Sequence, residues 1–476
     1  MAANGALQSV SLKVVVLEER NQVAFVEAGK EFVDVLVSFM TMPIGMIVRL
    51  SRDHLKDEMG CLKNLYNSIE KLDKAKLVRS AECKDMLLCP RSAAEFHYRK
   101  LKLDLIDRSA NEYYVCQSCD LVSFYQTAHC RCENSFKYRV ELKGNKSSVP
   151  RDEGVFVNPN MPFMIDDEFL VKHSSTKNLV ELKIKDDTWR TENIGKDKVL
   201  KLMVRSLVSQ TPFSDIFMNN LPDSNTSSTI CPGKYKPRRA GQSQNVTDSA
   251  TRISLNLVID NPRERVLYAE AGEDFVDLLC SFLTIPLCYF FKEFPHLPFK
   301  GSMGKLYKNI QDLDDNSFKS KEMKETLVNP KLAPGLAQHN QLIGLEEASN
   351  LSFKTLCSNF EIKRTELGSS SNQEEVETGR GFVKPTKFMV ENNLSVTHFS
   401  LESARKLMNE MEDIKEDKVI VDRDKALHLL AASLVSESAL TDVFILKKPK
   451  QEKKPKPKPK QVNRKDVDDD ECCCCF

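Results

Sequence analysis

The sequence Glu-Ala-Gly-Lys-Glu-Phe-Val-Asp-Val-Leu-Val-Ser-Phe at residues 27–39 occurs a second time, as Glu-Ala-Gly-Glu-Asp-Phe-Val-Asp-Leu-Leu-Cys-Ser-Phe at residues 270–282. The offset is 243 residues (270 − 27), and Glu, Ala, Gly, Phe, Val, Asp, Leu, Ser and Phe recur in one frame. A threonine and a proline just beyond also recur, Thr41 and Pro43 as Thr284 and Pro286. The pattern indicates a tandem duplication within one chain.

Each copy begins with the same predicted elements. Two runs rich in β-branched residues, at 11–17 and 22–26, recur at 253–259 and 265–269, and the charged or Asn/Pro-containing residues between them fit a hairpin turn. Apolar residues then follow at helical spacing, as Phe32, Val35, Leu36 and Phe39 do in the first copy. Each copy is therefore expected to open with a β-hairpin followed by helices.

Two further helical patterns are shared. The first contains Leu-Tyr-x-x-Ile, at residues 65–69 and 306–310, and the second ends in Ser-Leu-Val-Ser, at residues 206–209 and 433–436. We expect an α+β or mixed α/β fold built from two tandem homologous repeats. The predicted boundaries are a flexible N-terminus at 1–10, repeat 1 at 11–218, a Ser/Asn/Pro/Gly-rich linker at 219–250, repeat 2 at 251–446 and a disordered tail at 447–476.

These boxes resemble the plant family of domain of unknown function 674. The resemblance extends over residues 11 to about 446 and rests on the Glu-Ala-Gly-x-x-Phe-Val-Asp box together with the two shared helix patterns. It implies a plant protein with a tandem arrangement. The family has no established activity, so the resemblance implies no functional residues.

The composition is that of a soluble globular protein, with 41% hydrophobic and 29% charged residues and a formal net charge of +1. That balance gives no overall field to attract nucleic acid, so we do not expect a nucleic-acid partner. Residues 1–25 show no secretory signal, which predicts an intracellular, cytoplasmic protein with reduced cysteines. The apolar stretch 32–50 contains a proline and charged residues, and it is interpreted as a core helix broken near Pro43 rather than a membrane span.

The box also places an aspartate, Asp34 or Asp277, beside the apolar stripe of each predicted helix. A buried acid with a catalytic role is one interpretation. The sequence favours a solvated acid in the first helical turn, stabilised by the helix dipole, because a single carboxylate without partners supports no mechanism.

A cysteine cluster is the one local pattern with evident chemistry. Cys116 and Cys119 form a C-x2-C pair, and Cys130 and Cys132 form a C-x-C pair ten residues later, within an insert at 113–132. Two close thiolate pairs can converge on a structural Zn²⁺, with His129 as an alternative ligand. Unliganded thiols and a redox-active C-x-x-C pair remain open alternatives. No equivalent set occurs in the second repeat, where only Cys357 lies in the comparable region.

The last thirty residues combine a Lys/Pro-rich run with a terminal cysteine cluster. The chain ends Cys-Cys-Cys-Cys-Phe, so Cys473 fits the C-a-a-X frame for prenylation and Cys472 is a second candidate lipidation site. The lysines would supply the electrostatic attraction to a membrane surface that a single lipid needs. A disordered tail with free thiols is the alternative.

No phosphate loop, nucleophile elbow or His-Glu-x-x-His motif is present, and the eight histidines are scattered singly. The sequence therefore favours a non-enzymatic binding or scaffold module that recognises an unknown protein partner and carries a structural zinc site. Two alternatives are an enzyme whose active site forms between the repeats, and a prenylated adaptor at the membrane periphery.

Overall fold

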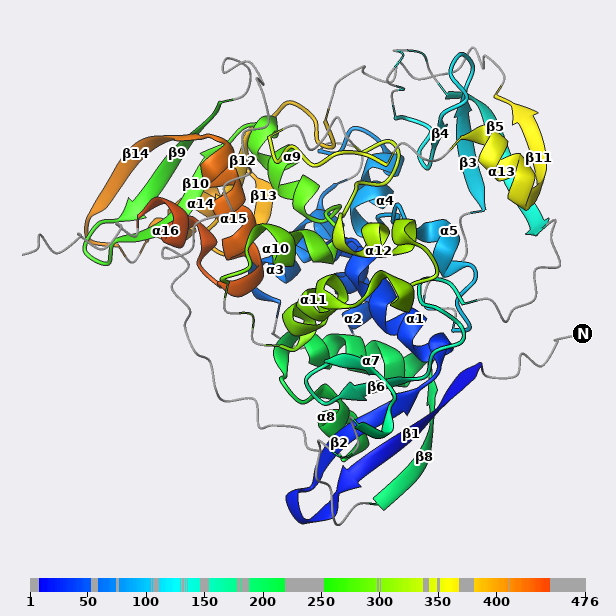
Figure 1. Cartoon of the computed structure of the whole chain (residues 1–476). Coiled ribbons are helices and arrows are strands. Elements are labelled where there is room, and N and C mark those ends of the chain that lie inside the picture. Colours follow the sequence, from blue (N-terminus) through cyan, green and yellow to red (C-terminus); the bar gives the residue numbers. More distant parts are fainter. Residues whose placement is uncertain are drawn as a thin grey trace, which may run out of the picture. The chain divides into compact units, whose positions relative to one another are not determined.

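A computed structural model gives the fold (Figure 1). The residues it describes are 8–445, apart from 53–58, 74–76, 104, 106–110, 129, 131, 133, 135, 146–153, 178–179, 181–187, 219–251, 298, 300, 337–341, 349–351, 368–380 and 410. The predicted linker at 219–250 and tail at 447–476 lie outside this part of the chain. Residues 8–218 are called here the N-terminal half and residues 252–445 the C-terminal half.

The N-terminal half opens with a hairpin and a helical layer and then forms further strands. Its elements are β1 (Ser9–Leu17), η1 (Glu18–Arg20), β2 (Gln22–Ala28), α1 (Lys30–Ser38), η2 (Phe39–Thr41), α2 (Ile44–Ser51), α3 (Gly60–Lys71), α4 (Ala81–Leu88), α5 (Glu95–Tyr98), β3 (Glu112–Cys116), β4 (Val122–Ser123), β5 (Phe136–Asn145), β6 (Phe163–Asp166), β7 (Val171–His173), β8 (Thr188–Gly195), α7 (Lys196–Val208) and α8 (Pro212–Phe217). Strand β1 begins two residues before the predicted start of repeat 1.

The C-terminal half has nearly the same series of elements. They are β9 (Ile253–Asp260), β10 (Arg265–Ala271), α9 (Glu273–Phe282), α10 (Leu287–Glu293), α11 (Met303–Asp312), η4 (Asp315–Ser317), α12 (Lys321–Val328), α13 (Phe353–Asn359), β11 (Phe360–Glu366), β12 (Phe388–Glu391), β13 (Val396–His398), α14 (Leu401–Met408), β14 (Ile414–Val421), α15 (Arg423–Val435) and α16 (Ala439–Phe444).

Each half contributes a five-stranded antiparallel sheet. The strand orders are β7-β6-β2-β1-β8 and β13-β12-β10-β9-β14, in which corresponding strands occupy corresponding places. Side chains alternate across each strand, and in β1 the residues that face the helices are buried. Of the predicted alternatives, α+β or mixed α/β, the antiparallel sheets confirm the α+β class, and the predicted opening hairpins are confirmed as well.

The predicted break in the apolar stretch 32–50 is also confirmed. Helix α1 ends at Ser38, and Pro43 immediately precedes α2. Pro43 lies opposite Pro286 in an isolated antiparallel β-bridge. Proline has no N–H, so the flanking residues make the hydrogen bonds: Ile44 N–H donates to the Ile285 carbonyl and Leu287 N–H to the Met42 carbonyl, both at 2.9 Å. Corresponding segments of the two halves therefore meet each other here.

The two aspartates of the repeated box are not solvated, and the prediction that they are is wrong. Asp34 is 2% exposed, and its carboxylate accepts hydrogen bonds from the backbone N–H groups of residues 155–157 at 2.7 to 2.9 Å. Asp277 is half-buried and accepts from the N–H groups of residues 382 and 383. Burial raises the pKa of Asp34 to about 6 and that of Asp277 to about 7. The backbone N–H donors act in the opposite direction and lower both pKa values, but burial has the larger effect.

The loops that these aspartates bind each pair with the opposite half. Val157 forms a β-bridge with Phe318, and Val383 forms the corresponding bridge with Val78. The loop bound by Asp34 carries Gly-x-Phe-Val, at 154–157, and the loop bound by Asp277 carries Gly-Phe-Val, at 381–383. Gly381 packs so closely on Asp277 that a Cβ there would lie 2.1 Å from the carboxylate. Each carboxylate therefore anchors a loop that joins the two halves.

A third sheet is built from both halves. Its order is β11-β5-β3-β4, and Figure 1 shows β11 of the C-terminal half beside β5 of the N-terminal half. The predicted insert at 113–132 supplies most of β3, all of β4 and the loop after it. The main hydrophobic core is likewise continuous through the two halves.

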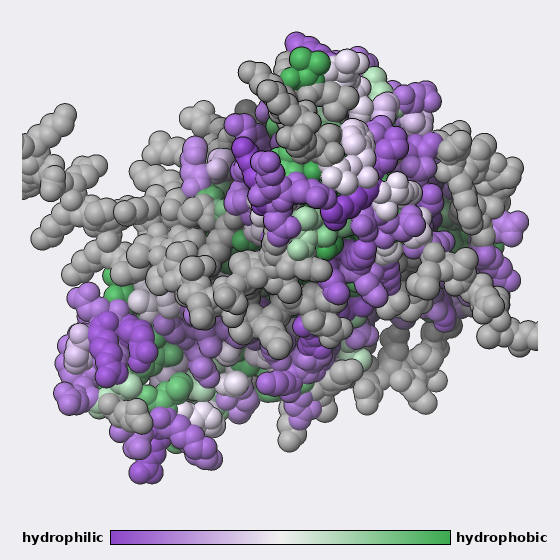
Figure 2. Space-filling model, turned by 90° about the horizontal axis from the view of Figure 1, so that it is seen from below, coloured by the Kyte–Doolittle hydropathy of each residue, from purple (hydrophilic) through white to green (hydrophobic). Residues whose placement is uncertain are grey.

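Among the described helices, none combines the length and apolar character that crossing a bilayer requires. The face drawn in Figure 2 is largely hydrophilic where it is coloured, with hydrophobic side chains in small separate patches.

Two corresponding glycines lie where a helix of one half meets the other half. Gly60 has a φ of +52°, and an added Cβ would lie 2.8 Å from the Ser436 carbonyl oxygen. At Gly301 the Cβ would lie 2.1 Å from the Ser206 carbonyl oxygen. Both contacts are with backbone, which cannot move aside as a flexible side chain can.

Alanine at either position should destabilise the protein. We expect Gly60→Ala and Gly301→Ala each to lower the free energy of unfolding by about 2–4 kcal/mol, because the methyl group forces the halves apart. Urea unfolding followed by circular dichroism measures the change. Gly272→Ala is the control, since nothing lies within 4 Å of its Cβ position, and it should change stability by less than about 1 kcal/mol. Equal effects in all three variants would contradict this packing.

Candidate metal centre

The first cysteine pair lies on a tight turn between β3 and β4. The strand ends at Cys116, whose N–H donates to the Leu121 carbonyl at 2.9 Å and so closes the turn. Asp120 takes up the left-handed conformation within it (φ +57°), which aspartate tolerates better than most residues. The Ser118 N–H then lies 3.4 Å from the Cys116 sulfur, as a donor to that sulfur. This turn places Cys116 and Cys119 on one side of the hairpin.

The second pair approaches from the loop before β5. The Cys130 N–H donates to the Asn134 carbonyl at 3.4 Å, and the Asn134 side-chain amide donates to the Cys132 sulfur at 3.4 Å. Cys130 is buried and Cys132 is exposed, so the loop presents one sulfur from the interior and one from the surface.

The four sulfur atoms converge. Cys116 lies 3.4 Å from Cys132 and Cys119 lies 3.1 Å from Cys130, and all four sulfurs are within 4.8 Å of one another. These separations exceed the length of a disulfide, about 2.05 Å. Four sulfurs arranged tetrahedrally around a metal at about 2.3 Å would be about 3.8 Å apart, so the cluster fits a metal ion after small adjustments.

The protein environment acts unequally on the thiols. Burial raises the pKa of Cys130, whereas hydrogen bonds from Asn134 lower the pKa of Cys132 to about 6. A metal ion binds thiolates, so it must displace protons from the thiols whose pKa is high. Metal affinity at this cluster should therefore fall as the pH falls.

The structure thus brings together all four cysteines that the sequence singled out as metal ligands. Cys357 lies on α13 and does not belong to the group. His129, the alternative ligand, and the lipidation candidates Cys472 and Cys473 lie outside the described residues.

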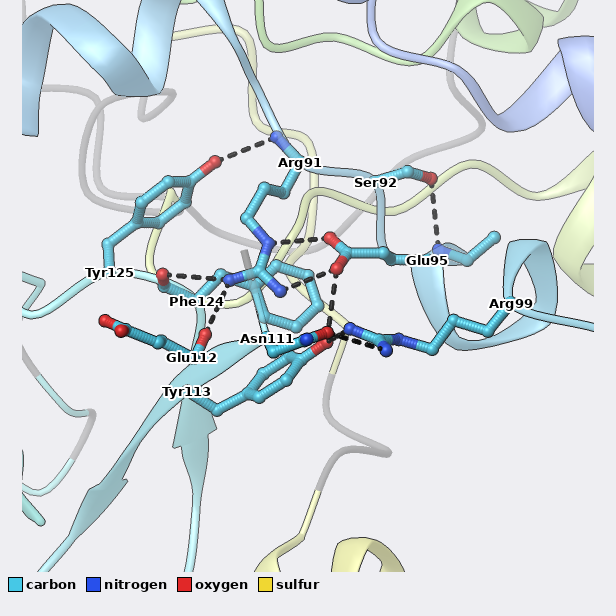
Figure 3. Close-up of polar contacts among 10 residues, drawn as sticks. Arg91, Ser92, Glu95, Arg99, Asn111, Glu112, Tyr113, Phe124 and Tyr125 are labelled. Atoms are coloured by element: carbon cyan, nitrogen blue, oxygen red, sulfur yellow. Dashed lines mark hydrogen bonds and ion pairs between the residues drawn. The ribbon is translucent and has the colours of Figure 1, made fainter. Parts of the chain in front are cut away.

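A buried ion pair holds the cysteine-bearing hairpin against the helices (Figure 3). The Arg91 guanidinium donates to both oxygens of Glu95 at 2.6 Å, and its side chain is only 10% exposed. It also lies over the rings of Tyr113, at 4.5 Å, and Phe124, at 4.2 Å, which come from β3 and the segment after β4. One Arg91 nitrogen donates to the carbonyl of Glu112, so the ion pair is bound to the backbone of the sheet as well.

Sequence reasoning missed this arrangement. Arg91 and Glu95 are four residues apart, a spacing that is common for exposed pairs on a helix surface. No local pattern in the sequence distinguishes a buried pair from an exposed one.

The pattern of the family described as protein of unknown function (DUF674) matches residues 7–419 and 407–472. The chain belongs to the DUF674 family. No curated protein and no solved structure matches this DUF674 chain.

Removing the Glu95 carboxylate should destabilise this DUF674 protein. We expect Glu95→Ala to lower the free energy of unfolding by about 3–5 kcal/mol, because it leaves the buried Arg91 guanidinium without its carboxylate. Urea unfolding measures the loss. The matched control is Glu402→Ala, which breaks the exposed i,i+4 pair with Lys406 (78% and 75% exposed) and should cost less than about 1 kcal/mol. Similar losses in both variants would show that the Arg91–Glu95 pair is not buried in solution.

Proposed function

We propose that this protein is a non-enzymatic binding or scaffold module in which a structural Zn²⁺ stabilises the third sheet. The observation that carries the proposal is the convergence of four thiols, from Cys116, Cys119, Cys130 and Cys132, within 4.8 Å. Four sulfur ligands favour zinc or an iron–sulfur centre over the metals that prefer oxygen. Zinc is favoured here because two short ligand pairs joined by a loop are typical of structural zinc sites.

A metal at this place would act as a cross-link. The turn between β3 and β4 supplies Cys116 and Cys119, and the loop before β5 supplies Cys130 and Cys132, so a bound ion would join two separate segments of the chain. A site with four protein ligands has no open position for a water molecule, so a stabilising role is favoured over catalysis. The sheet it would hold is the one that β11 of the C-terminal half completes.

We also infer that the chain arose by internal duplication. Corresponding strands occupy corresponding places in the two five-stranded sheets, which supports the inference. The four-cysteine cluster has no counterpart in the C-terminal half. A catalytic site required in each half would be expected in both copies, so the single cluster also favours a structural role.

Zinc content tests the proposal. Full-length protein in which Cys472, Cys473, Cys474 and Cys475 are replaced by serine, purified under reducing conditions, should contain about one zinc per chain by elemental mass spectrometry. The replacements remove the terminal thiols as a second source of bound metal. Adding Cys116→Ser and Cys119→Ser should abolish the zinc, and chelation should lower the thermal unfolding temperature.

The control is Cys357→Ser, which removes a thiol outside the cluster and should leave the zinc content unchanged. Protein with intact, reduced cluster thiols but no zinc would contradict the proposal. Stoichiometric iron with visible charge-transfer absorption would contradict the choice of metal.

A further inference from the structure

A cavity of about 610 Å³ lies between the N-terminal and C-terminal halves. Its lining comes from the segment around α5 in one half and from α12, α13 and the start of β11 in the other. Cavities of this size, at interfaces between parts of a fold, commonly bind small molecules. None of the four clustered cysteines contributes to the lining.

The body of the cavity is apolar. Phe96 approaches from the N-terminal half, and Met323, Leu356 and Phe360 approach from the C-terminal half. Phe96 and Phe360 lie 5.7 Å apart between ring centroids and together form an aromatic wall. Flat apolar molecules gain from lying against such a surface.

The charged groups at the cavity favour an anion. Lys100, Lys321 and Lys331 line it, and in the part of the chain that the structure describes none of them lies within an ion-pair distance of a carboxylate. Two glutamates also line it, but Glu325 already accepts a hydrogen bond from Asn329. Three lysines against two glutamates leave a net positive charge among the residues that line the cavity.

His97 adds a neutral polar group to the same cavity. Its ring lies 5.5 Å from that of Phe156, and burial lowers its pKa to about 4, with the charges of Lys100 and Lys319 acting in the same direction. A neutral imidazole has one N–H donor and one acceptor nitrogen. Among the described residues none forms a hydrogen bond with this imidazole.

We propose that the cavity binds a small apolar carboxylic acid in its ionised form. The apolar body lies against Phe96, Leu356 and Phe360. The carboxylate faces Lys100 and Lys321, and the neutral imidazole of His97 donates a hydrogen bond to one of its oxygens. The proposal does not depend on the metal, because it uses a different set of side chains.

The test uses 8-anilino-1-naphthalenesulfonate, an aromatic anion that fluoresces when it leaves water. Titration of the full-length folded protein should give one saturable site per chain. The related N-phenyl-1-naphthylamine, which lacks the sulfonate, should bind at least about tenfold more weakly. The charge of a competitor should decide whether it displaces the sulfonate probe. The anion 1-naphthoate should displace it, and the cation 1-naphthylmethylammonium, which has the same ring, should not.

Charge-reversal variants locate the site. Lys100→Glu combined with Lys321→Glu should weaken binding of the sulfonate probe at least tenfold and leave binding of the neutral probe unchanged, because both lysines are exposed and substitutions of exposed charges change stability little. The control is Lys354→Glu, an exposed lysine of α13 outside the lining, which should leave both affinities unchanged. His97→Phe should weaken the binding of 1-naphthoate more than the binding of the neutral probe.

Several results would overturn the proposal. They are the absence of saturable binding, equal affinity for the charged and neutral probes, displacement by the ammonium compound, or an equal loss of affinity in the Lys354→Glu control. Zinc content and probe affinity are measured on the same preparations, so failure of the metal proposal and failure of this one give separate results.

Discussion

The constraint on which the rest of the structure depends is the anchoring of two loops by two carboxylates, those of the buried Asp34 and the half-buried Asp277. Asp34 and Asp277 each accept backbone N–H groups from a loop more than a hundred residues away in the chain. Burying a carboxylate is unfavourable unless hydrogen bonds replace its water, and the loop backbones supply those bonds. Because each loop also pairs with the opposite half, the aspartates connect the two halves as well as each half to itself.

The halves are consequently interdependent. Several contacts cross between them. They are the β-bridge of Pro43 with Pro286, the close packing of Gly60 and of Gly301 against backbone carbonyls of the other half, and the pairing of β5 with β11. Several of these contacts occur twice, in corresponding places. The third sheet and the apolar cavity depend on this arrangement, since β11 belongs to one half and β5 to the other, and residues of both halves line the cavity.

Local patterns in the sequence predicted much of the fold. The hairpins, the helices that follow Gly29 and Gly272, and the break at Pro43 are set by periodicity and by backbone chemistry within a few residues. The solvent exposure of Asp34 was predicted wrongly, because the backbone groups that bind its carboxylate, at 155–157, are distant in sequence and make no periodic pattern. The shared Gly-Phe-Val character of the two loops was a signal that could have located them.

The candidate functional residues likewise divide into those set by a local sequence pattern and those brought together by distant parts of the chain. The four cysteines could be predicted because their spacing is short and chemically specific. The Arg91–Glu95 pair and the cavity at Phe96 could not, since burial of the pair and apposition of the lining arise only when the two halves meet. Asp34 and Asp277 have raised pKa values, both oxygens of Asp34 and one oxygen of Asp277 accept backbone N–H groups, and neither aspartate lines the cavity.

Because the two halves share a sheet, a core and several backbone contacts, neither half should fold as an independent monomer. Residues 1–235 and 236–476 can be expressed separately, and their mass in solution and unfolding can be measured by sedimentation and circular dichroism. We expect each fragment alone to lack a cooperative unfolding transition or to fold only as a dimer, and an equimolar mixture to form a 1:1 complex that unfolds cooperatively. A monomeric fragment that unfolds cooperatively by itself would contradict the claim.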